Sequence, residues 1–328
     1  MPITPLISVC IPVYNTEPVL RRCLDSVAGQ AFRNFEVVIV NDCSTGQDNQ
    51  GNDCKKIVKA FKKKLKNHVE YLEHSENKGI VITRKDLVYA ARGTFIFMLD
   101  SDDFLPPDAL ENLASAADDA DIIHGHALTF TTKDEQICIT EKERGMVFHG
   151  TINGTDIFQN AFVKKTISNY LWAKLIRREV FLDALEFIPD VYCILAEDLL
   201  ISFFITRIAK KYTGIDKLVY YYGVSTGITS KVIITSLDRW EQCCSVASVF
   251  TTIFLWQQEQ TELTGTNPLT PEQEKAIAGF AVGYLNNNLE QLNRAVDPKI
   301  RPQAHKILED FWGESFVKRI ENERNNSL

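Results

Sequence analysis

Short apolar runs alternate with helical patterns over the first hundred residues, and this alternation limits the fold more than any other feature of the chain. In residues 17–30, for example, Leu20, Leu24 and Val27 recur at three- and four-residue spacing and form one apolar face. Such alternation is typical of βαβ units, so we predict an α/β protein with a mostly parallel sheet and flanking helices. The predicted strands are residues 6–14, 35–42, 69–75 and 94–100, and the predicted helices are residues 17–30, a lysine-rich stretch that ends near residue 67, and residues 79–93.

The pattern changes beyond residue 120. Four more strands are predicted at 120–131, 137–140, 145–150 and 217–224, the first three with antiparallel character, and two helices at 152–163 and 197–211. From Thr235 onward the chain is predicted to be helical, at 235–260, 271–294 and 299–324, with a loop at 261–271 where Gly265 and two prolines interrupt the pattern. We therefore expect an α/β domain over residues 1–231 and a helical C-terminal region over residues 232–328.

The composition excludes several classes of protein. A formal charge of -7 and a pI near 5.5 argue against a general nucleic-acid binder. No stretch approaches the roughly 18 uncharged apolar residues of a membrane-spanning helix, and the opening residues MPITPLISVCIPVY lack the basic start of a signal peptide. None of the eight cysteines forms a C-x-x-C pair, and several lie in apolar runs, which favours a reducing, cytoplasmic environment.

Three of the predicted parallel strands are followed directly by polar residues. Tyr14-Asn15 follows the first strand, Asn41-Asp42 follows the second, and residues 100–103 follow the fourth. In open α/β sheets, ligands bind outside the carboxyl ends of the strands. If these strands are adjacent, their polar ends share one rim, and a ligand site is expected there.

The stretch Asp100-Ser101-Asp102 places two carboxylates two residues apart at the end of a strand. Hard divalent cations prefer oxygen ligands, and Mg²⁺ is typically bound by one or two protein carboxylates together with substrate phosphates and water. The pair therefore suits a metal–diphosphate site that binds Mn²⁺ or Mg²⁺. Asp103 is expected to point elsewhere and to cap the helix that begins near Pro106 or Pro107. The alternative is a polar turn with helix caps and no metal.

Five segments in order resemble the family-2 glycosyltransferases: ISVCIPVYN (7–15), VVIVNDCST (37–45), NKGIVITRK (77–85), ARGTFIFMLDSDDF (91–104) and AEDLL (196–200). The resemblance is strong over residues 5–130 and continues through YLWAKLIRREVF (170–181) to about residue 231, whereas the last hundred residues carry no motif of the family. It implies the GT-A fold and an inverting transfer of a sugar from a nucleotide donor, usually a UDP-sugar.

The resemblance also implies roles for individual residues. Pro12, Tyr14 and Asn15 are expected along the nucleoside with Glu17 nearby, and Asp42 is expected to accept a hydrogen bond from the base. Arg84 aligns with a basic residue at the nucleotide rim, where a cation suits a diphosphate. Asp100 is expected at the ribose or the metal's water shell, and Asp102 at the metal itself. Ser101 and Glu197, which neighbour these groups, are expected to contact the substrate. Trp172 is expected either to stack on a sugar or to pack in the core.

Asp198 aligns with the catalytic base of the family. A positioned carboxylate can take the proton of the acceptor hydroxyl, and a helix N-terminus would favour its ionised form. Two departures are Asn41, where the family often has an acidic residue, and Lys85, where it usually has Asn. The histidine metal ligand that some members of the family have after the late strand has no counterpart in residues 220–231, where Ser225, Thr229 and Lys231 are candidates for phosphate contacts.

Two further segments have open interpretations. Seven lysines in residues 55–66 form either the solvated face of a helix packed on the sheet or a surface attracted to an anionic membrane with a glycolipid acceptor. The apolar segment 245–258 is either buried core, a homo-oligomer contact, or a surface that docks on a membrane or a partner. The acceptor implied by the family is a surface polysaccharide or lipopolysaccharide, made at the inner face of the cell membrane.

Two other functions compete with glycosyl transfer. A nucleotidyltransferase also uses aspartates on an α/β sheet, but it usually has a glycine-rich, basic phosphate loop, and PVYNTEPVL contains neither glycine nor lysine. A non-catalytic protein that binds nucleotide-sugars or glycans would be expected to lack the base or the metal carboxylates, and both are present here.

Overall fold

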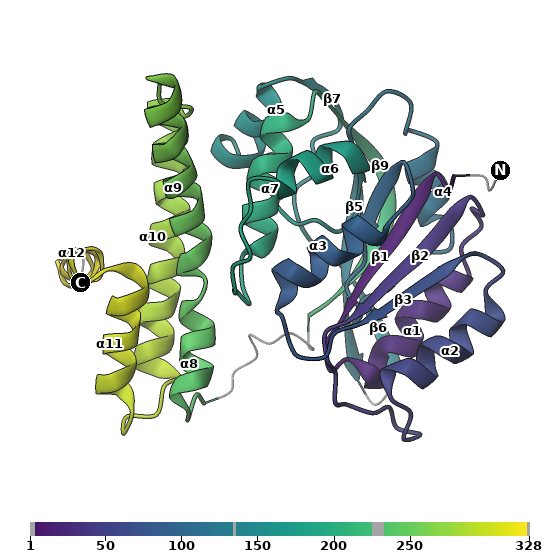
Figure 1. The fold of residues 1–328 in the computed structure, drawn as a ribbon, viewed down its shortest axis with the longest axis horizontal. Coiled ribbons are helices and arrows are strands. Elements are labelled where there is room, and N and C mark those ends of the chain that lie inside the picture. The colour runs from purple at the N-terminus through teal and green to yellow at the C-terminus, as the bar shows by residue number, and fades with distance from the viewer. Residues whose placement is uncertain (1–3, 134–135, 225–232, 327–328) are drawn as a thin grey trace. The chain divides into compact units, whose positions relative to one another are not determined.

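The structure is a computed structural model of the chain, and it describes residues 4–133, 136–224 and 233–326 (Figure 1). The chain divides into two compact units. The first contains residues 1–187 and 201–227, and the second contains residues 188–200 and 228–328. The division therefore differs from the expected one in the segment 188–200, and the expected boundary at 231/232 lies outside the described residues.

The first four strands form the parallel part of the sheet, as the sequence predicts. In the order β3-β2-β1-β4, each strand runs parallel to its neighbour. All four are rich in apolar residues, and β1, β2 and β4 are buried along their whole length because helices cover both faces of a parallel sheet. Their bounds are β1 Ile7–Val13, β2 Phe35–Asn41, β3 Val69–Glu73 and β4 Phe95–Met98.

The sheet continues with strands of mixed direction, in the order β4-β8-β5-β9-β7, and β6 pairs with β5. β8 (Lys174–Arg177) was not predicted, because its four residues merge with the helical pattern that follows. β5 (Ile122–Lys133) and β6 (Gln136–Glu143) pair antiparallel, as predicted. β9 (Lys211–Gly223) begins six residues before the predicted strand, and β7 (Gly150–Asn153) begins where the predicted strand 145–150 ends.

Helices cover both faces of the parallel strands (Figure 1). α1 (Glu17–Ala28) and α2 (Cys54–Lys64) share one apolar cluster with Ile7, Val9 and the other odd-numbered residues of β1. The even-numbered residues face the other way, and the Cys10 thiol donates to the carbonyl of Leu87 in α3 (Ile80–Ala90) at 3.9 Å. This two-residue alternation is the geometry of a strand buried on both faces.

α4 (Ala109–Ala114), α5 (Asp156–Phe158) and α6 (Arg178–Leu185) are short, whereas α7 (Glu197–Ile208) is as long as α1. α4 follows β4, and α6 follows β8. The predicted helix 152–163 is instead one turn, α5, that continues as the π-turn η1 (Gln159–Val163). α7 matches the predicted start at residue 197, and it begins in the segment grouped with the second unit.

The second unit is a helical bundle, as predicted, but two of the three predicted helices are broken. The stretch 235–260 divides at residues 245–246, and the stretch 299–324 divides at Gly313, whose φ of 84° is not helical. The helix predicted at 271–294 has those bounds, and its first turn is closed by a capping box between Thr270 and Gln273. The helices are α8 Leu237–Cys244, α9 Ala247–Thr264, α10 Pro271–Arg294, α11 Arg301–Trp312 and α12 Glu314–Asn325.

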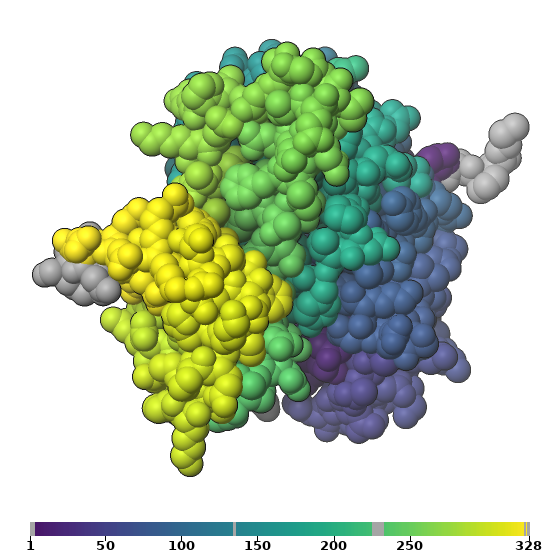
Figure 2. Space-filling view, turned by 60° about the vertical axis from the view of Figure 1, so that its left-hand side comes forward, coloured from purple at the N-terminus to yellow at the C-terminus, as the bar shows by residue number. Residues whose placement is uncertain are grey.

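A buried tryptophan and a buried asparagine join the helices of this unit. The Trp240 indole is inaccessible to solvent and donates to the carbonyl of Ala304 at 2.7 Å. Asn288 donates to the carbonyl of Cys243 and accepts from the indole of Trp312. Because each of these buried polar groups has a partner, they are compatible with an apolar core. Figure 2 shows the C-terminal helices of the unit in yellow as a mass of closely packed atoms.

No helix within the described part of the chain is both long enough and apolar enough to cross a membrane.

Candidate active site

The polar residues that follow three parallel strands lie at the carboxyl-terminal end of the sheet, which we call the rim. β2, β1 and β4 are adjacent, and they are followed by Asp42, by Tyr14-Asn15 and by residues 99–103. The expectation that these residues share one rim is thereby confirmed. Pro12 lies at the end of β1 and is buried, whereas the Tyr14 ring beyond it is 48% exposed. The rim therefore combines a buried proline with an accessible aromatic ring.

Asn15 organises the loop that follows β2. Its backbone is in the left-handed region, with φ of 54°, a conformation that asparagine tolerates better than most residues. Its side-chain oxygen accepts from the backbone N–H groups of Thr45 and Gly46 at 2.9 and 3.2 Å. Asn15 thus fixes residues 45–46 against the end of β1, which positions this loop beside the rim.

Glu17 is the first residue of α1, and it is fully buried. Neither of its carboxylate oxygens has a hydrogen-bond partner among the described residues. A Cβ atom at Gly46 would lie 2.3 Å from Glu17 Oε2, so the absence of a side chain there leaves room for this carboxylate. Buried polar groups are normally paired, and both oxygens of Glu17 retain their capacity to accept hydrogen bonds.

Asp42 is buried and already accepts three hydrogen bonds. Its Oδ1 faces His74 Nδ1 at 2.7 Å and accepts from the backbone N–H of Lys78 at 2.8 Å. Its Oδ2 accepts from the backbone N–H of Gly79 at 2.9 Å. A carboxylate has about four acceptor positions, so one remains, on Oδ2. Asp42 therefore joins β2 to the start of α3 and can take one further donor.

The three carboxylates of residues 100–103 have different surroundings. The Asp100 side chain is partly exposed and lies 3.3 Å from the guanidinium of Arg84, which is itself buried. Ser101 is buried, and its hydroxyl lies 2.7 Å from that of Thr16 at the start of α1. Asp102 is partly exposed, and its backbone carbonyl accepts from the Arg22 guanidinium. Arg84 and Asp100, expected at the same rim, are therefore brought together.

Asp103 holds this loop against β9 and does not cap a helix, contrary to expectation. It is buried, and it accepts from the Tyr220 hydroxyl at 2.8 Å and from the Gly223 backbone N–H at 2.7 Å. The N-cap residue of α4 is instead Asp108. Burial and the neighbouring charges of Asp102 and Asp100 raise the pKa of Asp103 well above its usual range.

The donor set fits a divalent cation. Asp100 and Asp102 both retain partial solvent access, and carboxylate oxygens are the ligands that Mg²⁺ and Mn²⁺ prefer. Burial is the main cause of the raised pKa of Asp103, and the negative charges of Asp102 and Asp100 raise it further. A cation bound at Asp100 and Asp102 would offset that charge.

Trp172 lies in the core. It is 2% exposed and stacks between Tyr170, at 4.5 Å between ring centroids, and Tyr220, at 5.1 Å. Of the two roles left open by the sequence, this packing favours the structural one, because stacking on a sugar needs an accessible face. Through Tyr220, Trp172 supports the residue that holds Asp103 in place.

Sequence reasoning missed Tyr220 and Arg22, which both contact the carboxylate loop. Three consecutive tyrosines at 220–222 give no signal for which one faces Asp103, because the register of β9 decides it. Arg22 lies in α1 and packs over the rings of Phe104 and Phe130 as well as donating to Asp102. The position of Arg22 within the helical pattern gives no signal that it contacts the carboxylate loop.

Glu197 and Asp198 are the first two residues of α7, as predicted, and the residue before them, Ala196, has a φ of 63°. Both belong to the segment grouped with the second unit. The convergence of Asp198 with Asp42 and Asp102 stays a prediction. Ser225, Thr229 and Lys231 lie outside the described residues.

Comparison with solved structures defines the class of protein through its fold. The crystal structure of S. aureus TarS 1–349 in complex with UDP-GlcNAc matches with a TM-score of 0.55 and 20% identity, covering 98% of this chain and 92% of that one. The mannosyltransferase PcManGT from Pyrobaculum calidifontis, in complex with GDP-Man and Mn²⁺, matches with a TM-score of 0.52 and 14% identity, covering 98% and 83%. Such identities show the fold alone, which is the GT-A fold.

The sequence profile described as Glycosyl transferase family 2 matches residues 8–182, just over half of the chain, and this chain belongs to that family. GlyA of Streptococcus pneumoniae is 28% identical over 69% of this chain and 32% of its own length. EpsH of Bacillus subtilis is 32% identical over 54% of this chain and 48% of its own length. The chain thus spans about a third to about half of the length of these two relatives.

Proposed function

We propose that this chain is an inverting glycosyltransferase that moves a sugar from a UDP-sugar to a hydroxyl group of a glycan acceptor. The observation that supports the proposal is that Asn15, Asp42 and Asp100 follow three adjacent parallel strands at the same end of the sheet. Such an edge is where α/β sheets bind ligands. Of two proteins that share the fold, one was solved with UDP-GlcNAc and the other with GDP-Man, so a nucleotide-sugar donor is the ligand class we assign.

The nucleoside is proposed to lie against Pro12 and the exposed ring of Tyr14. The remaining acceptor position on Asp42 Oδ2 suits the N3–H of uracil, since that group is a hydrogen-bond donor. Glu17 is proposed to lie near the nucleoside, beside the loop that Asn15 holds, and its buried carboxylate has no hydrogen-bond partner among the described residues. The carboxylates of Asp42 and Glu17 can accept hydrogen bonds. A nucleoside has ring N–H and hydroxyl groups that can donate them.

The diphosphate is proposed to lie beside Asp100, Ser101 and Asp102, with Mn²⁺ or Mg²⁺ held by the two aspartates. When bound, this cation stabilises the negative charge that the departing diphosphate gains as the glycosidic bond breaks. Arg84 neutralises part of the charge of Asp100 and holds that side chain in one orientation. Asp103 takes no part in this contact, because it is buried and is held towards β9 by Tyr220 and Gly223.

Asp198 is proposed as the base that takes the proton from the acceptor hydroxyl. Transfer of that proton to a positioned carboxylate typically contributes about 10²–10⁴-fold to the rate. Asp198 is the second residue of α7, and the positive end of a helix dipole favours the ionised form that a base requires. Glu197, beside it, is proposed to contact the substrate.

The acceptor is proposed to be a growing surface polysaccharide or a related glycolipid, reached at the inner face of the cell membrane. One relative, TarS of Staphylococcus aureus, is named a poly(ribitol-phosphate) beta-N-acetylglucosaminyltransferase. α2 buries Ile57, Val58 and Phe61 and leaves most of its lysines exposed. The helix therefore packs on the sheet as the simpler interpretation predicts, and the exposed lysines also suit peripheral attraction to an anionic membrane.

The decisive test is release of UDP from a panel of UDP-sugars in the presence of Mn²⁺ or Mg²⁺. Asp102→Ala should reduce release by about a hundredfold or more, because metal stabilisation of the leaving group amounts to several kcal/mol. Asp118→Ala, which removes an exposed aspartate elsewhere on the same unit, is the matched control and should release UDP at the wild-type rate. Binding without turnover of any donor, in the presence of glycan acceptors, would favour a non-catalytic nucleotide-sugar-binding protein.

The family match weakens the alternative that the protein is a nucleotidyltransferase. The match to glycosyl transferase family 2 covers the strands and carboxylates on which that alternative rested. Incubation with a nucleoside triphosphate and a sugar phosphate should accordingly yield no pyrophosphate.

A further inference from the structure

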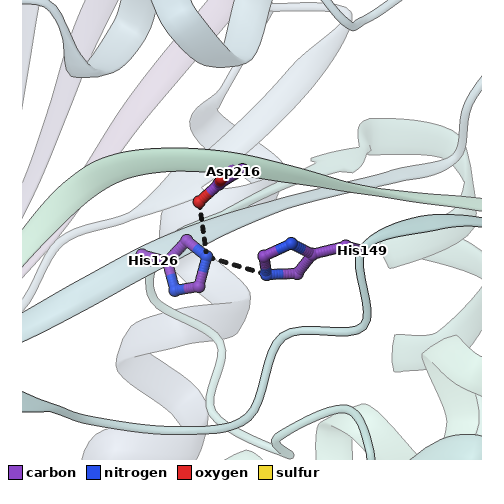
Figure 3. A group of neighbouring side chains, drawn as sticks. All are labelled: His126, His149 and Asp216. Carbon is purple, nitrogen blue, oxygen red and sulfur yellow. Dashed lines mark hydrogen bonds and ion pairs between the residues drawn. The ribbon is translucent and has the colours of Figure 1, made fainter.

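Two histidines and an aspartate from three separate segments meet on the first unit, apart from the carboxylate loop (Figure 3). His126 comes from β5, His149 directly precedes β7, and Asp216 comes from β9. The ligand atoms of the three side chains all lie within 4.8 Å of one another. The hydrogen bonds and ion pairs of His126 are with His149, Asp216 and Glu143.

The backbone is shaped to bring these side chains together. His124 of β5 pairs with Gly214 of β9, and His126 pairs with Leu218. An advance of two residues along β5 therefore corresponds to an advance of four residues along β9. β9 therefore bulges between Gly214 and Leu218, and Asp216 lies at the centre of the bulge. Bulges of this kind redirect side chains and are common next to functional sites.

A glycine allows the third segment to approach. The carbonyl oxygen of Phe148 would lie 1.7 Å from a Cβ atom at Gly214, so only glycine fits beneath it. The register of β7 with β9, in which Gly150 pairs with Gly214, places His149 beside the bulge. The segment before β7 thus approaches Gly214 of β9 closely, and His149 lies within reach of His126.

The distances suit a tetrahedral metal site. His126 Nε2 lies 2.9 Å from His149 Nε2 and 3.4 Å from Asp216 Oδ1. Ligands that are about 2.0–2.1 Å from a tetrahedral Zn²⁺ lie about 3.3–3.4 Å from one another. One of these two spacings therefore matches such a site already, and the other needs an opening of a few tenths of an ångström. The third spacing, between the ligand atoms of His149 and Asp216, is within 4.8 Å.

A carboxylate also orients His126 correctly for metal binding. Glu143 Oε1 lies 3.4 Å from Nδ1 of His126, on the opposite side of the ring from His149 and Asp216. A carboxylate beside Nδ1 favours the tautomer of His126 that carries its proton on Nδ1. The lone pair of Nε2 is then available to a metal, and this arrangement recurs around metal-bound histidines. Two imidazole nitrogens and one carboxylate form a ligand set that suits Zn²⁺, whereas Mg²⁺ requires oxygen ligands.

We propose that His126, His149 and Asp216 bind one Zn²⁺ ion, which ties β5, β9 and the segment before β7 together. His126 is mostly buried, with 16% of its side chain exposed, whereas Asp216 is 86% exposed, so the fourth coordination position faces water. The site is independent of the proposed transfer reaction, because none of its ligands belongs to the rim of β1, β2 and β4.

The test is calorimetric titration of untagged, chelator-treated protein with ZnCl₂ in excess Mg²⁺, which occupies carboxylate sites and leaves imidazoles available. Wild-type protein should bind one Zn²⁺ and unfold at a higher temperature with Zn²⁺ than with chelator, because a ligand of the folded state raises its melting temperature. His149→Gln should abolish this uptake, and Glu143→Gln should weaken it by about 10–100-fold. His68→Gln, which changes another exposed histidine, should bind like wild type.

His149 is exposed, so its replacement should leave the unfolding temperature in chelator unchanged. If His149→Gln nevertheless unfolds early, Asp216→Asn provides the second variant with the same expected loss. Replacement by Co²⁺ offers an independent readout, since tetrahedral Co²⁺ absorbs visible light, and the band should be absent in His149→Gln. No uptake by wild type, or equal uptake by wild type and His149→Gln, would refute a site at these residues.

Discussion

Buried carboxylates have three different surroundings in the α/β unit. Asp103 accepts from Tyr220 and Gly223, whereas Glu17 has no hydrogen-bond partner among the described residues. Glu36, at the start of β2, accepts from the Ser8 hydroxyl and from the backbone and guanidinium of Arg92. Since burying a charge without partners is costly, the two paired carboxylates are expected to be structural and the partnerless one to serve a ligand.

Glu36→Gln should destabilise the protein by about 1–3 kcal/mol at pH 7, because it removes charge-assisted hydrogen bonds from a buried group. Burial raises the pKa of Glu36, but the hydrogen bonds from Arg92 and Ser8 outweigh burial, so the pKa is lowered overall. A carboxyl group with a lowered pKa stabilises the folded state above its unfolded pKa, and this stabilisation is lost as the pH falls. Urea unfolding should therefore show a difference between wild type and variant that shrinks from pH 7 towards pH 4.

Glu76→Gln provides the control for this series, because Glu76 is exposed and its replacement should leave the stability at both pH values unchanged. A difference between wild type and Glu36→Gln that stays constant from pH 7 to pH 4 would contradict the assigned pKa shift.

At the scale of elements, close backbone approaches set the shape of the first unit. β4 follows α3 through Gly93, whose N–H donates to the Ser8 hydroxyl at 2.8 Å. A Cβ atom there would lie 2.6 Å from the Ser8 nitrogen and 2.8 Å from the Ile7 carbonyl carbon. The parallel pairing of β1 with β4, from Ile7–Phe95 to Cys10–Met98, therefore depends on the absence of a side chain at this position.

Gly93→Ala should destabilise the first unit by about 1–3 kcal/mol, because overpacking against backbone atoms forces the strands apart. Gly279→Ala is the matched change in the second unit. Gly279 lies inside α10 with nothing near its Cβ position, so alanine should stabilise the protein by about 0.5–1 kcal/mol. Denaturant unfolding of both variants gives the comparison, and equal effects of the same sign would contradict the role assigned to Gly93.

The whole molecule contains two units that differ in architecture. The rim with Asp42, Asp100 and Asp102 belongs entirely to the α/β unit, whereas Asp198 belongs to the segment 188–200 that is grouped with the helical unit. Donor binding and proton transfer are therefore assigned to different parts of the chain, and a single substitution should separate them.

Asp198→Asn should retain donor binding and lose transfer. UDP with Mn²⁺ at about 100 times its Kd should stabilise wild type and variant alike, by about 2.7 kcal/mol, because the ligand binds only the folded state. Transfer to an acceptor should fall by about 10²–10⁴-fold, the usual contribution of a general base. Thermal unfolding with UDP and Mn²⁺ measures the first quantity, and product formation measures the second. Wild-type transfer by Asp198→Asn would place the base at another residue.

The sequence by itself determined the class of fold, the parallel direction of the first strands, and the residues at their ends, whereas the order β3-β2-β1-β4 came from the structure. Hydrophobic periodicity and strand-end polarity are local signals, so residues 7–15, 35–42 and 95–103 could be placed without coordinates. It also predicted the start of α7 at Glu197 and the bounds of α10, because both helix starts carry acidic residues in the first turn.

Only the tertiary structure decided which side chains meet across the sheet. Tyr220 reaches Asp103, Trp172 lies between two tyrosines, and His126 faces Asp216, because the register and the bulge of β9 set these contacts. Register depends on pairing between segments about a hundred residues apart, and no local pattern records it. The breaks at residues 245–246 and at Gly313 were likewise not predicted, and α8, α11 and α12 each bury apolar residues in one shared cluster with α10.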